Sequence, residues 1–185
     1  MDSLNGRGIL MTLKCKFSPL GKPDVDTYAP GTVVYENRPA NNTMTNVSQP
    51  VSRGVYELMC CSGGGGEWCY IGCNQGAAGS FFKGEVYFDD DKTLEIQVGG
   101  GTGGYSHNGY DTYIAGCILC PGGRSANASC PGSTAAPTLM DGMQIVSAEI
   151  NAGGVCGGGS LFPGTDYGAK KAAGYMKLTY LRIEP

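Results

Sequence analysis

The sequence predicts an all-β fold: a jelly-roll-like antiparallel sandwich with packed polyglycine II-type glycine segments and very little helix. Three observations lead to this fold class. Short segments of alternating or continuous apolar residues recur between turn-forming residues. Glycine, at 32 of 185 residues, is gathered in clusters that separate these segments. No window carries a sustained apolar period of 3.6 residues, and the best helical candidate, residues 135–148, is broken by Pro137 and Gly142.

The first fifty residues have the pattern of an N-terminal arm or attachment segment. Residues 8–17 (GILMTLKCKF) alternate apolar and polar positions, which predicts a half-buried strand. Residues 32–36 (TVVYE) predict a short strand between two loops. Those loops, residues 19–31 and 39–50, are rich in Pro, Gly, Asn, Thr and Ser.

Residues 51–185 follow this arm of residues 1–50 and are expected to form one glycine-rich β domain. Six segments in it are strand-like: residues 55–60 (VYELMC), 85–88 (EVYF), 94–98 (LEIQV), 111–115 (DTYIA), 144–150 (QIVSAEI) and 175–183 (YMKLTYLRI). The charged run Asp89-Asp90-Asp91-Lys92 joins the second and third of them and predicts a hairpin loop.

The glycine clusters are predicted to be packed parts of the fold. Floppy loops between short strands of one sheet system would carry a large ordering entropy. Glycine accepts polyproline II geometry, and neighbouring glycine helices can approach closely and pair their backbone N–H and C=O groups. Disordered surface loops are the alternative. The glycines assigned this structural role are Gly63, Gly64, Gly65, Gly66, Gly99, Gly100, Gly101, Gly153, Gly154, Gly157, Gly158 and Gly159.

Charge and apolar content exclude two classes of partner. The formal net charge is −3, so the chain lacks the basic surface that a nucleic-acid backbone requires. No run of 18 or more apolar residues is present, and residues 1–20 lack the pattern of an export signal. We therefore expect no nucleic acid, no membrane insertion and synthesis in a cytoplasm.

The order of the elements resembles the glycine-rich β domain of phage tail-fibre and adhesin tips, and more distantly the glycine-rich domain of the anaplastic lymphoma kinase ectodomain. The resemblance rests on YELMCCSGGGG, GCNQGAAGSFFKGEVYF, LEIQVGGGTGG, INAGGVCGGGS and GYMKLTYL, in that order over about residues 51–181. It implies bundled polyglycine helices, display on a virion or extracellular surface, and a trimeric assembly. The cysteines are unusual for the phage members of this family.

Nine cysteines leave the redox state open. They are Cys15, Cys60, Cys61, Cys69, Cys73, Cys117, Cys120, Cys130 and Cys156. Buried thiols, one or two disulfides, and a zinc site that uses the CxxC of Cys117 and Cys120 are the alternatives. Only one CxxC pair is present where a zinc-ribbon site has two, so we assign no metal.

The sequence assigns no catalytic residue and no cofactor. Gly99, Gly101 and Gly104 satisfy G-x-G-x-x-G after a strand, but the next residues cannot begin the helix that a dinucleotide needs. His107 is the only histidine, and no nucleophile elbow accompanies it. Asp89, Asp90 and Asp91 are most simply a solvated turn. We therefore expect no enzyme activity.

A tyrosine-rich segment, residues 103–113 (GGYSHNGYDTY), is the predicted receptor-binding loop. Tyr, Ser, Gly and Asn together are typical of antibody paratopes, where tyrosine supplies contact area at low entropic cost. The alternative is that these aromatic side chains cover glycine helices or a subunit interface. The candidate binding residues are Tyr105, Ser106, His107, Asn108, Tyr110, Asp111 and Tyr113, with Trp68 and Tyr70 beside the first glycine run.

These observations together predict a virion-surface receptor-binding protein, a tail-fibre tip or adhesin that recognises a host-surface glycan or protein. The alternative is a structural head-fibre, decoration or surface-filament subunit. We expect a homo-oligomer, a trimer, with residues 1–50 at the subunit contact and attached to a larger fibre or particle.

Overall fold

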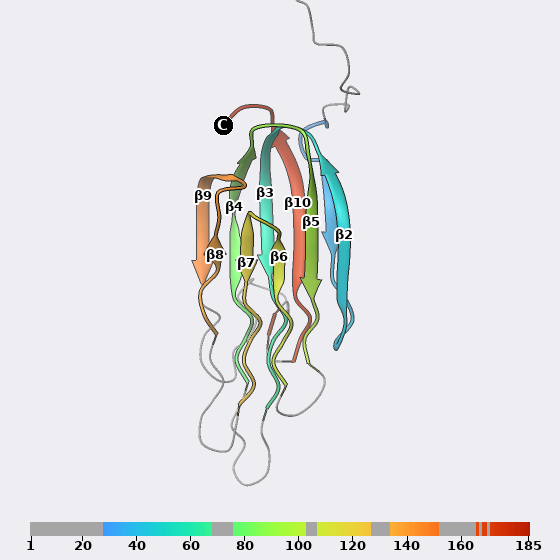
Figure 1. Ribbon diagram of the computed structural model, residues 1–185, viewed down its shortest axis with the longest axis vertical. Helices are drawn as coiled ribbons and strands as arrows, with labels where there is room; N and C mark the ends of the chain where they lie inside the picture. The colour runs from blue at the N-terminus through green and yellow to red at the C-terminus, as the bar shows by residue number, and fades with distance from the viewer. Residues whose placement is uncertain are drawn as a thin grey trace, which may run out of the picture.

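The computed structural model describes residues 28–67, 76–102, 107–126, 134–151, 166, 168–169 and 171–185. These residues contain ten strands and no helix, so none of the described chain is a helix that could cross a membrane. The strands form two five-stranded antiparallel sheets that lie one in front of the other (Figure 1). The predicted all-β antiparallel sandwich is confirmed.

Each sheet collects strands from distant parts of the chain. The first sheet has the order β1 (Val33–Asn37), β10 (Tyr175–Arg182), β3 (Gly54–Cys61), β4 (Phe81–Phe88) and β9 (Gln144–Asn151). The second has the order β2 (Met44–Val51), β5 (Lys92–Gly99), β6 (Thr112–Ile114), β7 (Ile118–Cys120) and β8 (Thr138–Leu139).

The core fills the space between the two sheets, and the alternation of buried and exposed side chains is clearest in β5. In β5, Leu94, Ile96 and Val98 are buried, whereas Thr93 and Glu95 are exposed. The first sheet contributes fully buried residues that include Leu58, Phe82, Val86 and Leu178. Burying each of these side chains stabilises the fold by about 1.5–3 kcal/mol, so in β5 the alternation fixes which face of the strand points inward.

The prediction of a loop over residues 39–50 is wrong for most of these residues. β2 begins at Met44 and pairs with β5 without interruption, from Met44 opposite Gly99 to Val51 opposite Lys92. β2 is an edge strand with little burial, so its sequence lacks the alternating apolar residues that mark a central strand. β1 pairs with β10 in the first sheet and β2 pairs with β5 in the second, so the chain before residue 51 contributes to both sheets. The predicted boundary between residues 50 and 51 falls inside β2.

The hairpin predicted around the acidic run is also wrong. β4 pairs with β3 and β9 in the first sheet, whereas β5 pairs with β2 and β6 in the second. The acidic run therefore carries the chain across the sandwich from one sheet to the other. Phe88 and Leu94 lie on either side of the run, and both belong to the shared core. They come from strands in opposite sheets, which face each other across the core and do not pair.

β9 forms one edge of the first sheet and is exposed at all eight positions. Its large apolar side chains are Ile145, Val146 and Ile150, which are 40%, 41% and 48% exposed. The pairing with β4 shifts register between Glu85 and Val86, so a bulge interrupts the strand. This edge presents apolar side chains and carries no lysine, arginine or proline.

The glycine-rich segments continue the strands as a bundle at one end of the sandwich (Figure 1). Gly63 and Gly66 donate backbone hydrogen bonds to the carbonyls of Tyr110 and His107, three residues apart in one neighbouring segment. Between them, Gly64 and Gly65 donate to two other segments, at Ala172 and Ala77, both over 2.9 Å.

The carbonyls of the same four glycines follow the same repeat. Those of Gly63 and Gly66 accept from Gly123 and Ala126, which again lie three residues apart in one segment. Those of Gly64 and Gly65 accept from Thr102 and Lys171, each over 3.2 Å. A helix with three residues per turn makes such a pattern. The polyglycine II geometry itself stays a prediction.

Glycine is required here by the closeness of the neighbouring backbone. A Cβ atom placed on Gly63 would lie 1.9 Å from the carbonyl oxygen of Gly100, and one on Gly109 would lie 2.0 Å from that of Gly63. Five further glycines that are predicted to have this structural role lie outside the described residues: Gly153, Gly154, Gly157, Gly158 and Gly159. So does the predicted strand over residues 8–17.

Candidate binding site

The segment of residues 107–110 is fixed to the glycine bundle by its backbone. Its carbonyls at His107 and Tyr110 accept hydrogen bonds from Gly66 and Gly63, over 2.9 and 3.1 Å. Gly109 N–H donates to Gly123, and Tyr110 N–H donates to Gly100. Because four backbone bonds hold so short a segment, its side chains start from a rigid base.

His107 and Tyr110 line one hollow of about 400 Å³, together with Asn42, Thr102 and Asn108. His107 and Asn108 are exposed, Tyr110 is 39% exposed, and Thr102 is buried. Asn42 comes from the turn before β2, where it adopts a φ of 61° and donates its N–H to Gly101 over 2.7 Å. The hollow is thus built from three separate segments that converge on the glycine bundle.

The described residues of the lining offer hydrogen-bonding groups and one tyrosine ring, and none of them is an aspartate, glutamate, lysine or arginine. These five residues carry two amides, a hydroxyl, an imidazole and a phenol. Neutral hydroxyl-rich molecules suit such a lining better than strongly charged ones.

Two of the predicted binding residues use their side chains to hold the backbone. Asn108 Oδ1 accepts a hydrogen bond from the N–H of Ser125 over 2.9 Å. Asp111 Oδ1 accepts one from the N–H of Gly122 over 2.7 Å. These bonds give both residues a structural task, and Asp111 is not among the residues that line the hollow.

The remaining predicted residues are not brought to the hollow by the described structure. Tyr113 lies in the middle of β6, half-buried and opposite Gln97 and Leu119. Trp68, Tyr70, Tyr105 and Ser106 lie outside the described residues. Sequence reasoning missed Asn42 and Thr102. Asn42 carries a turn signal of its own, but nothing in the sequence connects that turn to residue 107.

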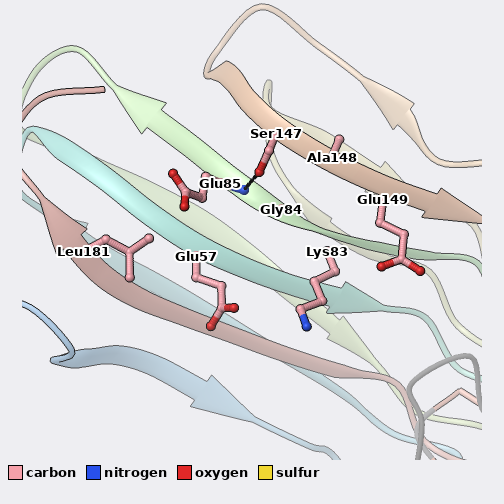
Figure 2. Close-up of a pocket in the computed structure, with 8 residues that line it drawn as sticks. All are labelled: Glu57, Lys83, Gly84, Glu85, Ser147, Ala148, Glu149 and Leu181. Atoms are coloured by element: carbon pink, nitrogen blue, oxygen red, sulfur yellow. Dashed lines mark hydrogen bonds between the residues drawn. The ribbon is translucent and has the colours of Figure 1, made fainter.

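A second hollow, of about 340 Å³, lies on the outer face of the first sheet, across β3, β4, β9 and the end of β10 (Figure 2). Gly84 is one of its lining residues, and the N–H of Glu85 donates to Ser147 Oγ over 3.1 Å. Its charged residues are Glu57, Lys83, Glu85 and Glu149. Glu85 is already paired with Arg182 at 2.6 Å, and none of the described residues that line this hollow is aromatic, so it offers less to a ligand.

Two carboxylates of the acidic run are paired with its own lysine. Lys92 Nζ lies 3.1 Å from Asp90 Oδ1 and 3.4 Å from Asp89 Oδ1. The backbone N–H of Asp89 and the Lys92 ammonium lower the pKa of the Asp89 carboxyl. Over the described parts of the chain, no group of three or more His, Cys, Asp or Glu residues could hold a metal ion.

Four of the nine cysteines are described, and all four are buried thiols: Cys60, Cys61, Cys117 and Cys120. Burial raises the pKa of Cys60, Cys61 and Cys117. These three thiols are therefore protonated at neutral pH, and a protonated thiol is a poor nucleophile. Cys15, Cys69, Cys73, Cys130 and Cys156 lie outside the described residues.

The comparisons with known proteins add no relative. No family model matches the chain, and neither the curated proteins nor the solved structures give a match.

Proposed function

We propose that this chain is a virion-surface receptor-binding protein, the tip of a phage tail fibre or an adhesin, and that it binds its ligand without catalysis. The observation that carries the proposal is the hollow between Asn42, Thr102, His107, Asn108 and Tyr110. Its side chains stand on backbone that the glycine bundle holds in place. A site that is rigid before binding loses little conformational entropy on binding, which favours recognition.

A host-surface glycan is the ligand that this lining fits best. A tyrosine ring can cover the apolar face of a sugar, and the amide and imidazole groups around it can hydrogen-bond to the sugar hydroxyls. Placement on a virion rests on the resemblance of the ordered glycine-rich motifs to phage fibre tips. Assembly as a homotrimer, with attachment to a larger particle through the N-terminal arm, belongs to the same proposal.

A structural head-fibre or filament subunit is the second candidate, and β9 is the observation that favours it. A long exposed edge strand with Ile145, Val146 and Ile150 can pair with a neighbouring subunit. In that case the tyrosines of the glycine end would cover backbone or a subunit contact.

The experiment compares Tyr110→Ala and His107→Ala with Tyr113→Ala, a tyrosine that lies in β6 away from the hollow. Binding of each purified full-length variant to host cells and to purified surface glycan is measured. Aromatic anchors are worth on the order of 2 kcal/mol, so Tyr110→Ala is expected to weaken binding about thirtyfold. Tyr113→Ala is expected to bind as the unmodified chain does.

Thermal melting and light scattering accompany the binding measurements. Unchanged binding by a folded Tyr110→Ala and His107→Ala double variant would refute the role of the hollow. If the same variant instead loses its oligomeric state, the structural-subunit function replaces the adhesin.

A further inference from the structure

Two buried thiols meet in the core from opposite sheets. Cys60 lies near the end of β3 in the first sheet, and Cys120 is the last residue of β7 in the second. Their Sγ atoms are 3.4 Å apart, and Cys120 Sγ is also 3.7 Å from the carbonyl oxygen of Cys60. Neither side chain has any exposed surface.

The position of this pair is at the junction of the sandwich and the glycine bundle. Cys60 is followed by Cys61, Ser62 and the glycines that begin at Gly63, and Cys120 is followed by Pro121, Gly122 and Gly123. Ser62 Oγ donates to the carbonyl of Pro121, so the two chains stay in contact just beyond the thiols. A covalent link here would tie both sheets together where both chains enter the bundle.

The other two described cysteines have different surroundings. Cys61 packs with Phe81 and Tyr175 in a separate apolar cluster. Cys117 packs in the main core, with its Sγ close to Gly142. Among the described cysteines, Cys60 and Cys120 are therefore the pair that the fold prepares for a cross-link.

We propose that Cys60 and Cys120 form a disulfide that links the two sheets once the protein meets an oxidising medium. The chemistry needs only these thiols and a small-molecule disulfide such as glutathione disulfide. The biological setting, release from a reducing cytoplasm onto an exposed surface, rests on the proposed function.

The exchange proceeds in two balanced steps. One cysteine thiolate attacks a sulfur of glutathione disulfide, forming a mixed disulfide and releasing one glutathione thiolate, which takes up a proton. The second cysteine thiolate then attacks the protein sulfur of the mixed disulfide and releases the second glutathione. Two protein thiols are oxidised, one glutathione disulfide is reduced to two thiols, and the two protein protons end on the glutathione sulfurs.

The burial of both thiols makes the reaction slow, because the attacking sulfur must become accessible through a local opening. The sulfurs must also approach from 3.4 Å to the ~2.0 Å of a disulfide bond. The product closes a loop between cysteines 60 positions apart in sequence, which restricts the unfolded chain. We expect the unfolding equilibrium constant of the oxidised protein to fall at least about tenfold relative to the reduced protein.

The test uses the full chain purified under reducing conditions and then incubated with glutathione disulfide without denaturant. Free thiols are alkylated in acid-quenched, denatured samples, and peptides are mapped by mass spectrometry. The expected result is a peptide pair joined through Cys60 and Cys120, together with a higher melting temperature that a reductant reverses. Cys117→Ala, which removes a buried thiol outside the pair, is expected to keep the cross-link, and Cys120→Ala to lose both the link and the shift in melting.

The proposal is overturned if both thiols remain alkylatable after prolonged oxidation, or if either one is found joined to another cysteine. Neither result depends on ligand binding. Loss of binding in the Tyr110→Ala variant with the cross-link intact would bear on the function alone, and absence of the cross-link with binding intact would bear on the disulfide alone.

Discussion

In the sandwich, side chains such as Phe82 and Ile118, both fully buried, make the contacts between layers, whereas in the glycine bundle backbone amides and carbonyls make them. A core of side chains tolerates small changes of volume because neighbouring side chains can shift rotamers. The bundle has no such freedom, since the atoms that would meet an added methyl group are carbonyl groups already held by hydrogen bonds. A change of one methyl group should therefore destabilise the glycine bundle much more than the sandwich.

The largest effect is expected from adding one methyl group inside the bundle. In Gly63→Ala the new Cβ would lie 1.9 Å from the carbonyl oxygen of Gly100, which no rotamer change relieves. We expect a loss of about 4 kcal/mol or more in the free energy of unfolding, measured by denaturant titration.

The control is Gly116→Ala, at a turn where φ is +70° and no atom lies within 4 Å of an added Cβ. It should lose only the ~1–2 kcal/mol that an alanine needs to adopt a left-handed conformation. If Gly63→Ala is no more costly than Gly116→Ala, the bundle is not packed as described.

A smaller effect is expected from removing one methyl group in the sandwich. Ile118→Val should cost about 0.5–1.5 kcal/mol, because the side chain is fully buried and the space left is small. Denaturant titration measures this loss in the free energy of unfolding. The control is Val146→Ala on exposed β9, which should change stability little. A cost for Ile118→Val equal to that of Gly63→Ala would remove the contrast between the two ends.

The smallest effect concerns an exposed ion pair, Arg38 with Asp166, whose charged atoms are 2.7 Å apart. The Arg38 guanidinium lowers the pKa of the Asp166 carboxyl below its ordinary value. A lowered folded-state pKa contributes stability above the ordinary pKa, and this contribution is lost as the pH falls below about 4, through the folded-state pKa.

Solvent screens this pair, so we expect Asp166→Asn to cost ~0.2–1 kcal/mol at pH 7 and less in 1 M salt. Melting curves at pH 7 and pH 3 measure the difference between the variant and the unmodified chain. A difference that persists undiminished at pH 3 would assign the effect to something other than the charge of Asp166.

Most of the long strands were predictable, and these include the edge strands β1 and β9, whose predicted bounds are within one residue of those observed. β3, β5 and β10 carry alternating or continuous apolar residues, and the sequence places each of them within a residue or two. The edge strand β2 was missed because one exposed face and one free edge remove the need for apolar alternation. The three-residue β7 was missed because it lies within a CxxC among turn-forming residues.

The candidate site was less predictable than the sandwich. A pattern of tyrosine, asparagine and glycine identified His107, Asn108 and Tyr110, and these do line one hollow. The same pattern could not separate Tyr113, whose side chain belongs to β6, from its neighbours. Nor could it find Asn42, since the contact with residues 107–110 arises only when the glycine segments bring separate turns together.

The open edge at β9 also bears on how the protein behaves at high concentration. All eight residues of β9 are exposed, Ile145 and Ile150 among them, and none is a lysine or proline; within the described residues the strand pairs on one side only, with β4. A net charge of only −3 gives neighbouring molecules little electrostatic repulsion. We therefore expect self-association through this edge to increase as the protein concentration rises, and light scattering over a concentration series measures it.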